Sequence, residues 1–316
     1  MSAPRPAEAG RPPRGSSKVA EPHLLESLGV IGVGNMGLAM ALRLRECGFK
    51  VMVRDIDPAR EALAVGCNVA TSPAQMAGAC DLIIIAVVDA AQTREVLFGD
   101  DGVVAGEACA RCIVLCPTIS PGDTEHFAAL LAHHGLQTID APMSGGPLRA
   151  RSGTMSLMLA CADEVLEHWR HVLAALSNRQ FRISEHPGDG ARTKLVNNLL
   201  AAINLAGAAE AMALAGKLGL DPATTLGVIE QSSGQSWIGS DRLHRALRGE
   251  AEAQAHLGLL AKDSRLAMAE AVAIGLPLAV GAAAAQCFAQ ALADGLGHAD
   301  DSMLWPWLAA ETAKQR

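Results

Sequence analysis

The sequence predicts an α/β protein in which a doubly wound parallel sheet is followed by an all-helical domain. Two observations lead to this prediction. Short apolar runs alternate with helical patterns through the first half of the 316 residues, and Ala and Leu at helical spacing dominate the second half. Strands that alternate with helices form a parallel sheet, because a crossover helix is needed to bring the chain back in the same direction.

Five apolar runs in the first half are expected to be the strands of this sheet. The run over 82–88, Leu-Ile-Ile-Ile-Ala-Val-Val, is apolar throughout, which is typical of a parallel strand buried on both faces. A helical pattern follows the first run, from about residue 36 to residue 47. The five runs are residues 28–33, 49–53, 82–88, 112–116 and 137–139.

Composition divides the chain into three parts. Residues 1–26 are rich in Pro, Arg, Ser and Ala and lack apolar periodicity, so we expect a disordered extension. Residues 27–188 contain the strand signals, and residues 189–316 contain helices punctuated by helix-stop glycines at Gly219, Gly275 and 295–297. The boundary between the two domains is expected near 185–188, Glu-His-Pro-Gly.

Charge and cysteine content exclude several classes of partner. The net charge of -7, without a basic run, argues against nucleic acid as a partner, and no segment is expected to span a membrane. The eight cysteines lie within apolar runs, which indicates a reducing, cytoplasmic compartment. Cys109 and Cys112 have CxxC spacing but no second pair, so we expect packing residues and no metal site.

A glycine motif opens the first predicted helix. Gly32-Val33-Gly34-Asn35-Met36-Gly37 follows a strand and precedes a helix, the context of a Rossmann dinucleotide-binding turn. The first glycine permits the turn, the second lets the backbone approach a pyrophosphate, and the third lets helix and strand pack closely. The N–H groups of the helix N-terminus then face the phosphates.

The second strand ends at Asp55, at the spacing expected for a carboxylate that binds the ribose of the cofactor. Such a carboxylate accepts hydrogen bonds from the ribose hydroxyls and repels a 2′-phosphate, which favours NAD over NADP. Asp57 is a weaker candidate, since it precedes Pro58 and suits a turn. Arg54 could bind a phosphate, but adjacent strand residues point to opposite faces, so Arg54 and Asp55 cannot readily serve the same ribose.

With these residues the chain resembles the 3-hydroxyacid dehydrogenase family, which includes 3-hydroxyisobutyrate dehydrogenases and tartronate semialdehyde reductases. The resemblance extends over about residues 28–303, in family order. It rests on five blocks: 34–37 with Met36; 140–146, Asp-Ala-Pro-Met-Ser-Gly-Gly, with its tail 150–154; 188–190 followed by Lys194, Asn197 and Asn198; 232–237, Ser-Ser-Gly-Gln-Ser-Trp; and 262–267, Lys-Asp-Ser-Arg-Leu-Ala.

The resemblance implies a substrate site whose residue types suit the chemistry. The loop of Ser144, Gly145 and Gly146 offers N–H groups and a hydroxyl to a substrate carboxylate. Lys194 and Asn198, four apart on a predicted helix, share one face, and Asn197 is a possible helper. In this family resemblance Lys194 is the general acid and base, and Asn198 positions the reacting group.

Further positions are implied to contact the cofactor. They are Asn35 and Met36 in the glycine turn, Val87 and Val88 after a strand, Thr118 near the nicotinamide, and Lys262 from the helical domain. The chain also departs from the family pattern at Pro117, Gln235 and Ser264, and it has Ala255 and His256 where an aromatic residue is usual. These departures indicate an altered substrate pocket.

The expected activity is therefore hydride transfer between a nicotinamide and a short 3-hydroxy acid or semialdehyde, without a metal. The substrate is expected to be a small carboxylic acid. The helical domain is expected to take part in binding it and to form a homodimer or homotetramer. Two alternatives remain: an imine reductase of the same superfamily, and a catalytically silent NAD-binding module. Both usually lack the lysine found here at Lys194.

Overall fold

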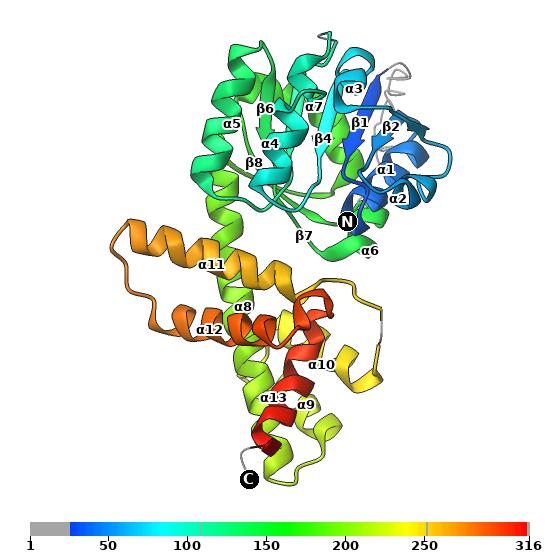
Figure 1. The fold of residues 1–316 in the computed structure, drawn as a ribbon. Helices are drawn as coiled ribbons and strands as arrows, with labels where there is room; N and C mark the ends of the chain where they lie inside the picture. The colour runs from blue at the N-terminus through cyan, green and yellow to red at the C-terminus, as the bar shows by residue number, and fades with distance from the viewer. Residues whose placement is uncertain (1–25, 108, 251, 315–316) are drawn as a thin grey trace, which may run out of the picture.

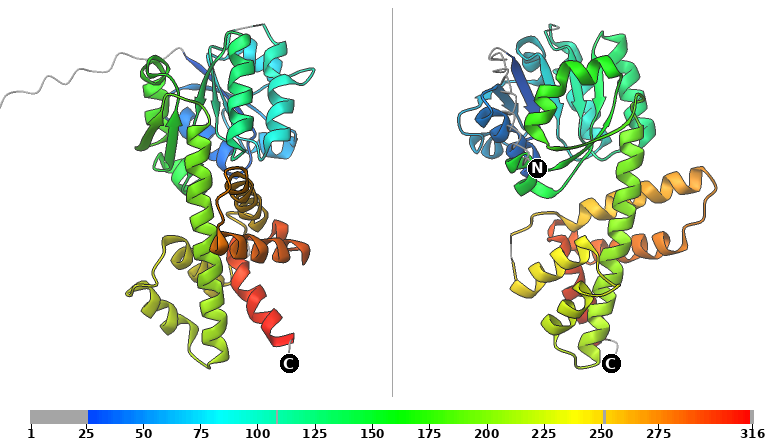
Figure 2. Two further views of the ribbon diagram at one scale, coloured as in Figure 1. Left: turned by 90° about the vertical axis from the view of Figure 1, so that its left-hand side faces the viewer. Right: turned by 180° about the vertical axis from the view of Figure 1, so that it is seen from behind.

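The computed structural model describes residues 26–107, 109–250 and 252–314. It shows a part built around a sheet and a part built of helices, joined by one long helix (Figure 1). The expected extension over residues 1–26 lies outside the described residues except for Glu26, whose carboxylate contacts the His171 ring. The C-terminal end of the chain lies at the far end of the helical part (Figure 2).

Nine strands of the described residues form a single sheet in the order β3-β2-β1-β4-β5-β6-β8-β7, with β9 beside β8. The strands are β1 (Ser27–Ile31), β2 (Lys50–Arg54), β3 (Asn68–Val69), β4 (Leu82–Ile85), β5 (Cys112–Leu115), β6 (Gln137–Asp140), β7 (Met143–Ser144), β8 (Ser156–Ala160) and β9 (Arg179–Ser184). The first six strands of this order are parallel. The five predicted runs correspond to β1, β2, β4, β5 and β6.

At one edge of the parallel sheet a strand runs in the opposite direction. Strand β8 runs antiparallel to both β6 and β7. The helix between β7 and β8, α6 (Gly146–Ser152), stays at the carboxyl ends of the strands and does not cross a face of the sheet (Figure 1). Without a crossover the chain re-enters the sheet from that end, so its next strand must run in the opposite direction.

The remaining helices flank the sheet or build the second part. Around the sheet lie α1 (Asn35–Glu46), α2 (Pro58–Ala62), α3 (Pro73–Ala79), α4 (Ala90–Phe98), α5 (Pro121–His133) and α7 (Asp163–Leu176). The second part contains α8 (Asp189–Lys217), α9 (Pro222–Glu230), α10 (Trp237–Arg248), α11 (Leu257–Ala273), α12 (Ala279–Ala293) and α13 (Leu304–Lys314). Short 3-10 helices lie at Val103–Ala105, Leu296–His298 and Asp301–Met303.

Both faces of the sheet are buried, as a doubly wound fold requires. Helices α1 and α7 cover one face, where Trp169 is fully buried. Helices α3, α4 and α5 cover the other face, around Leu97 and Phe127. Side-chain caps begin several helices, for example Asp89 at α4 and Ser120 at α5, because they satisfy N–H groups that lack helical acceptors. The predicted Rossmann-like sheet followed by a helical domain is thereby confirmed.

Helix α8 links the two parts and is the centre of the second. Its 29 residues pack against α10, α11, α12 and α13 (Figure 2). Among the described residues it is the one helix with the length and apolar composition to cross a membrane. The central helix of a globular domain has the same composition, and the four packed neighbours are consistent with that role. The carboxyl ends of the strands face this helical part, so a site between the two parts draws residues from both.

Candidate active site

A cavity of about 830 Å³ lies between the carboxyl ends of the strands and the helical part. It brings together most of the site residues predicted from the sequence. From the sheet side these are Gly34, Asn35, Met36, Val87, Val88, Thr118, Ser144, Gly145 and Gly146, and from the helical side Lys194, Asn197, Asn198 and Lys262. Gly32, Gly37 and Asp55 do not line this cavity.

The glycine turn at one end of the cavity fits a dinucleotide. Gly32 has a φ of 89°, a backbone conformation that side chains rarely tolerate. A Cβ atom on Gly37 would lie 1.8 Å from the Gly32 carbonyl oxygen, so helix and turn meet with no room for a side chain. A Cβ on Gly34 would meet no atom within 4 Å, so the backbone beside the cavity is open to a ligand.

Asp55 lies beside this turn, half-buried at the end of β2. Its carboxylate accepts the N–H of Val33 at 2.6 Å and the N–H of Asp57 at 3.0 Å. Asp57 caps α2 by accepting the N–H of Ala59 at 2.9 Å, which is the turn role that its position before proline suggested. Asp57 is thus engaged as a helix cap, and Asp55 is the one of these two carboxylates that contacts the glycine turn.

Arg54, the candidate for a phosphate contact, is already engaged. Its guanidinium forms a 2.7 Å ion pair with the buried Glu61 of α2. A different arginine, Arg60, reaches the cavity from α2, where its Nη1 lies 3.4 Å from Asn35 Oδ1. Sequence reasoning missed Arg60, because only the packing of α2 beside the turn places it there.

Lys194 lies in the first turns of α8 and is almost completely buried, with 7% of its surface exposed. Burial lowers the pKa of Lys194 from 10.5 to about 8, because the charged form loses its hydration. Asp263 opposes this shift by favouring the ammonium, and Lys262 adds to it by repulsion. Near neutral pH the amine can therefore both accept and release a proton.

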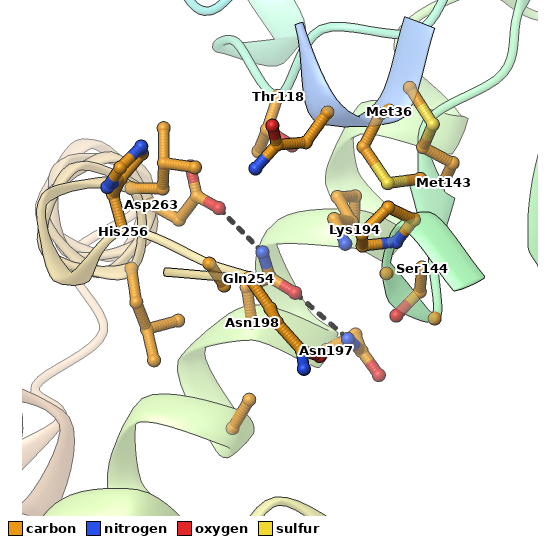
Figure 3. A pocket seen from close by; sticks show the side chains of 18 of the residues that line it. Met36, Thr118, Met143, Ser144, Lys194, Asn197, Asn198, Gln254, His256 and Asp263 are labelled. Atoms are coloured by element: carbon orange, nitrogen blue, oxygen red, sulfur yellow. Dashed lines mark hydrogen bonds between the residues drawn. The ribbon is translucent and has the colours of Figure 1, made fainter. Parts of the chain in front are cut away.

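Two amides on α8, which line the same cavity as Lys194, are hydrogen-bonded in series to an acidic residue of α11. Asn197 Nδ2 donates to Asn198 Oδ1 at 3.0 Å, and Asn198 Nδ2 donates to Asp263 Oδ2 at 2.6 Å (Figure 3). Asp263 is buried and also forms a 2.9 Å ion pair with Lys262. One hydrogen of Asn198 Nδ2 remains for a ligand, and its orientation is held by Asp263. Asp263 was not among the predicted site residues, although it directly follows Lys262 in sequence.

One contact joins the helical part to the sheet side of the cavity. The Lys262 ammonium donates to the backbone carbonyl of Thr118, which ties α11 to the loop after β5. Val87 and Val88 were expected to end a strand, but β4 ends at Ile85 and both residues belong to the following loop. Ser144 ends β7, and its hydroxyl faces the same space as Lys194 (Figure 3).

The start of α8 is anchored to the sheet by a buried carboxylate. Asp140, at the end of β6, accepts the N–H groups of Gly188 at 2.8 Å and Ala191 at 3.1 Å. Burial raises the pKa of Asp140 to about 6, and these backbone donors oppose the rise. The contact fixes where α8 begins, and so it sets the position of Lys194 one turn further along.

Some departures from the family pattern fall in the cavity wall. Pro117, Ala255 and His256 line it, whereas Ser264 is buried and its hydroxyl donates to the Ala261 carbonyl at 3.0 Å. Gln235 does not line the cavity. Other lining residues had no predicted role, notably Arg149, Trp237, Asp241 and Arg242.

Two known protein families match almost all of the described chain. Residues 27–184 match the family described as the NAD binding domain of 6-phosphogluconate dehydrogenase. Residues 188–308 match the family described as NAD-binding of NADP-dependent 3-hydroxyisobutyrate dehydrogenase. The two matches meet where β9 ends and α8 begins.

Individual proteins agree with these matches. The L-threonate dehydrogenase of Cupriavidus necator is 37% identical over 279 residues, which cover 87% of this chain and 94% of that protein. A crystal structure of a 3-hydroxyisobutyrate dehydrogenase from Salmonella typhimurium superimposes with a TM-score of 0.82 at 32% identity, covering 89% of this chain and 99% of that one.

An imine reductase variant from Myxococcus stipitatus, in complex with NAD+, shares the fold at lower similarity. It has a TM-score of 0.60 and 20% identity, and the match covers 90% of this chain and 99% of that one. Identity at that level supports the fold alone, whereas the dehydrogenases match in both sequence and structure over most of their length. The chain therefore belongs to the 3-hydroxyacid dehydrogenase family of NAD(P)-dependent oxidoreductases.

Proposed function

We propose that this protein interconverts a short 3-hydroxy acid and its semialdehyde, with Lys194 as the residue that takes and returns the proton. The observation that supports the proposal is the buried Lys194, whose pKa is lowered to about 8, in a cavity shared with the Ser144 loop and Asn198. A lysine with an ordinary pKa would remain charged at neutral pH and could not act as a base.

The residues divide the work as follows. Ser144 and the N–H groups of Gly145 and Gly146 hold the substrate carboxylate, and the free N–H of Asn198 orients the hydroxyl. Neutral Lys194 accepts the hydroxyl proton during oxidation, and the ammonium returns it during reduction. Bound in the glycine turn, a nicotinamide dinucleotide would supply the hydride acceptor or donor. Asp263 positions Asn198 and makes protonation of Lys194 more favourable.

The test measures turnover of a panel of substrates through the change in NADH absorbance. The panel contains 3-hydroxyisobutyrate, L-threonate and tartronic semialdehyde, the compounds that related enzymes are named for, together with a cyclic imine. We expect turnover of at least one acid and none of the imine. Turnover of the imine alone would favour an imine reductase, and tight NADH binding without any turnover would favour the silent binding module.

We propose NAD as the preferred cofactor, although the family matched by the helical part is described as NADP-dependent. The support is the Asp55 carboxylate beside the glycine turn, together with the engagement of Arg54 by Glu61. A carboxylate at the ribose accepts its hydroxyl hydrogens but repels a 2′-phosphate. Arg60 also lines the cavity near the turn, and its positive charge could oppose the preference for NAD by attracting a 2′-phosphate.

The cofactor preference can be measured with one conservative variant. We expect kcat/KM to be about 10- to 100-fold higher with NAD than with NADP, the equivalent of about 1–3 kcal/mol. Asp55→Asn should narrow this gap, because the amide oxygen can still accept the Val33 N–H while the charge is lost. Arg60→Gln serves as the companion variant. A wild-type preference for NADP that disappears in Arg60→Gln would contradict the role of Asp55.

We also propose that the helical part forms a homodimer or homotetramer and that the protein is cytoplasmic. Large apolar side chains are exposed along its helices, including Leu214 at 60%, Val272 at 75% and Val280 at 65%. We assign these exposed apolar side chains to an association interface, which is where exposed apolar surface on a folded protein is commonly buried. Light scattering during size exclusion should give a multiple of the chain mass, and Val272→Lys should shift it toward the monomer. A monomeric wild type at micromolar concentration would contradict the proposal.

A further inference from the structure

Arg149 lies in the cavity wall directly behind the proposed carboxylate loop. It belongs to α6, and its side chain folds back over Gly145. A Cβ atom on Gly145 would lie 2.8 Å from Arg149 Cδ and 3.3 Å from Arg149 Cβ. The aliphatic part of the side chain thus packs against the loop backbone, and the guanidinium remains at the cavity, half-buried.

The guanidinium of Arg149 also meets the helical part of the molecule. Its Cζ lies 5.2 Å from the ring centroid of Trp237, the first residue of α10, which lines the same cavity. An arginine over an aromatic face is held by attraction between the cation and the ring. Arg149 is therefore fixed between the loop that precedes it and the helix on the opposite side of the cavity.

The charge of Arg149 has no carboxylate partner within the described part of the chain, where no salt bridge involves it. The charge of the neighbouring Arg242, in contrast, is compensated by carboxylates. It forms ion pairs of 2.5 Å with Asp241 and 2.6 Å with Asp301, although it lies 6.0 Å from the same tryptophan ring. Of these two arginines, Arg149 alone presents an uncompensated positive charge to the cavity.

We propose that Arg149 supplies the positive charge that binds the substrate carboxylate held by the Ser144–Gly146 loop, and that Trp237 holds its guanidinium in place. The inference rests on the proposed function, because it assigns a residue to the same substrate. The loop offers only neutral donors, namely one hydroxyl and backbone N–H groups. A guanidinium beside them provides charge-assisted hydrogen bonds, which are roughly twice as strong as neutral ones.

This role makes Arg149 a specificity residue that does not take part in the chemical step. Carboxylate binding is the same in the ground state and in the transition state, so its loss raises KM more than it lowers kcat. The side chain also spans the cavity from α6 to α10. Substrate binding should therefore alter the surroundings of Trp237, which is 53% exposed.

The first test compares Arg149→Gln with a matched control on the same helix. Arg151→Gln is the control, because Arg151 pairs with Glu46 of α1 and does not line the cavity. With the best acid found in the substrate panel, Arg149→Gln should raise KM about 10- to 100-fold and change kcat little. Arg151→Gln should leave both constants unchanged, and Arg149→Lys should recover part of the loss.

The second test measures ligand binding without turnover. Isobutyrate, a short carboxylate without a hydroxyl group, should change the tryptophan fluorescence of the NADH complex, whereas the neutral isobutyramide should not. Arg149→Gln should abolish the response to isobutyrate, and Trp237→Phe should remove the signal while raising KM only about 2- to 5-fold.

The outcomes separate this inference from the proposed function. If the wild type turns over no acid, the proposed function fails. If it turns over an acid and Arg149→Gln keeps the wild-type KM and isobutyrate response, Arg149 does not bind the carboxylate. If Arg149→Gln instead weakens NADH binding and leaves isobutyrate binding intact, the guanidinium serves the cofactor and the inference is overturned.

Discussion

Replacing Lys194 with alanine is expected to lower kcat by about 10²–10⁴-fold, the usual contribution of a positioned general acid or base. The variant would lose the proposed acceptor of the hydroxyl proton, together with a positive charge that would stabilise a developing alkoxide. NADH affinity should change little, because the glycine turn and Asp55 lie in the sheet part. Steady-state kinetics and NADH fluorescence titration measure the two quantities separately.

The pH dependence gives an independent check on Lys194. Oxidation requires the neutral amine, so its kcat should rise with pH and level off above about 8, where the lowered pKa lies. Reduction requires the ammonium and should fall over the same range. Lys194→Arg should not rescue oxidation, since a guanidinium does not release its proton near neutral pH.

Lys217, exposed near the other end of the same helix, provides the control for Lys194. Lys217→Ala should retain wild-type kcat and the wild-type pH profile. Turnover near the wild-type level in Lys194→Ala would remove Lys194 from the mechanism. A large loss of NADH binding or of thermal stability in that variant would instead assign Lys194 a structural role.

Gly37→Ala is expected to destabilise the protein by about 3 kcal/mol or more, a value at the upper end of overpacking effects. The added Cβ would lie 1.8 Å from the Gly32 carbonyl oxygen, which is a backbone atom and cannot rotate away as the end of a flexible side chain could. Thermal or urea unfolding in the absence of cofactor measures the effect. A variant as stable as the wild type would show that α1 and the turn are less closely packed than described.

Gly34→Ala is the matched control, because a Cβ at this position meets no atom within 4 Å. Its stability without cofactor should fall by less than about 1 kcal/mol, the cost of alanine at a helix N-cap. Its affinity for NADH should nevertheless fall at least about tenfold, or ~1.4 kcal/mol, because the methyl group occupies the space where a pyrophosphate approaches. Unchanged affinity would place the dinucleotide elsewhere.

The order of the elements could be predicted from local sequence. The run Leu82–Ile85 is apolar at every position, and only a strand covered on both faces buries such a run. The glycine turn was recognisable because Gly32 and Gly37 stand at the spacing that a strand-turn-helix requires. Strands β3, β7, β8 and β9 were missed. Strand β8 pairs antiparallel with β6, and only long-range contacts determine this reversal at the edge of the sheet.

By itself, the sequence determined the fold class, the glycine turn and the placement of Lys194 and Asn198 on one face of a helix, because each depends on spacings of a few residues along the chain. The tertiary structure decided what lies across the cavity from them. Asp263 meets Asn198 from 65 residues away, and Trp237 of α10 meets Arg149 of α6. Local propensity carries no information about such distant contacts. The lowered pKa of Lys194 likewise depends on burial, which the packing of several elements creates together.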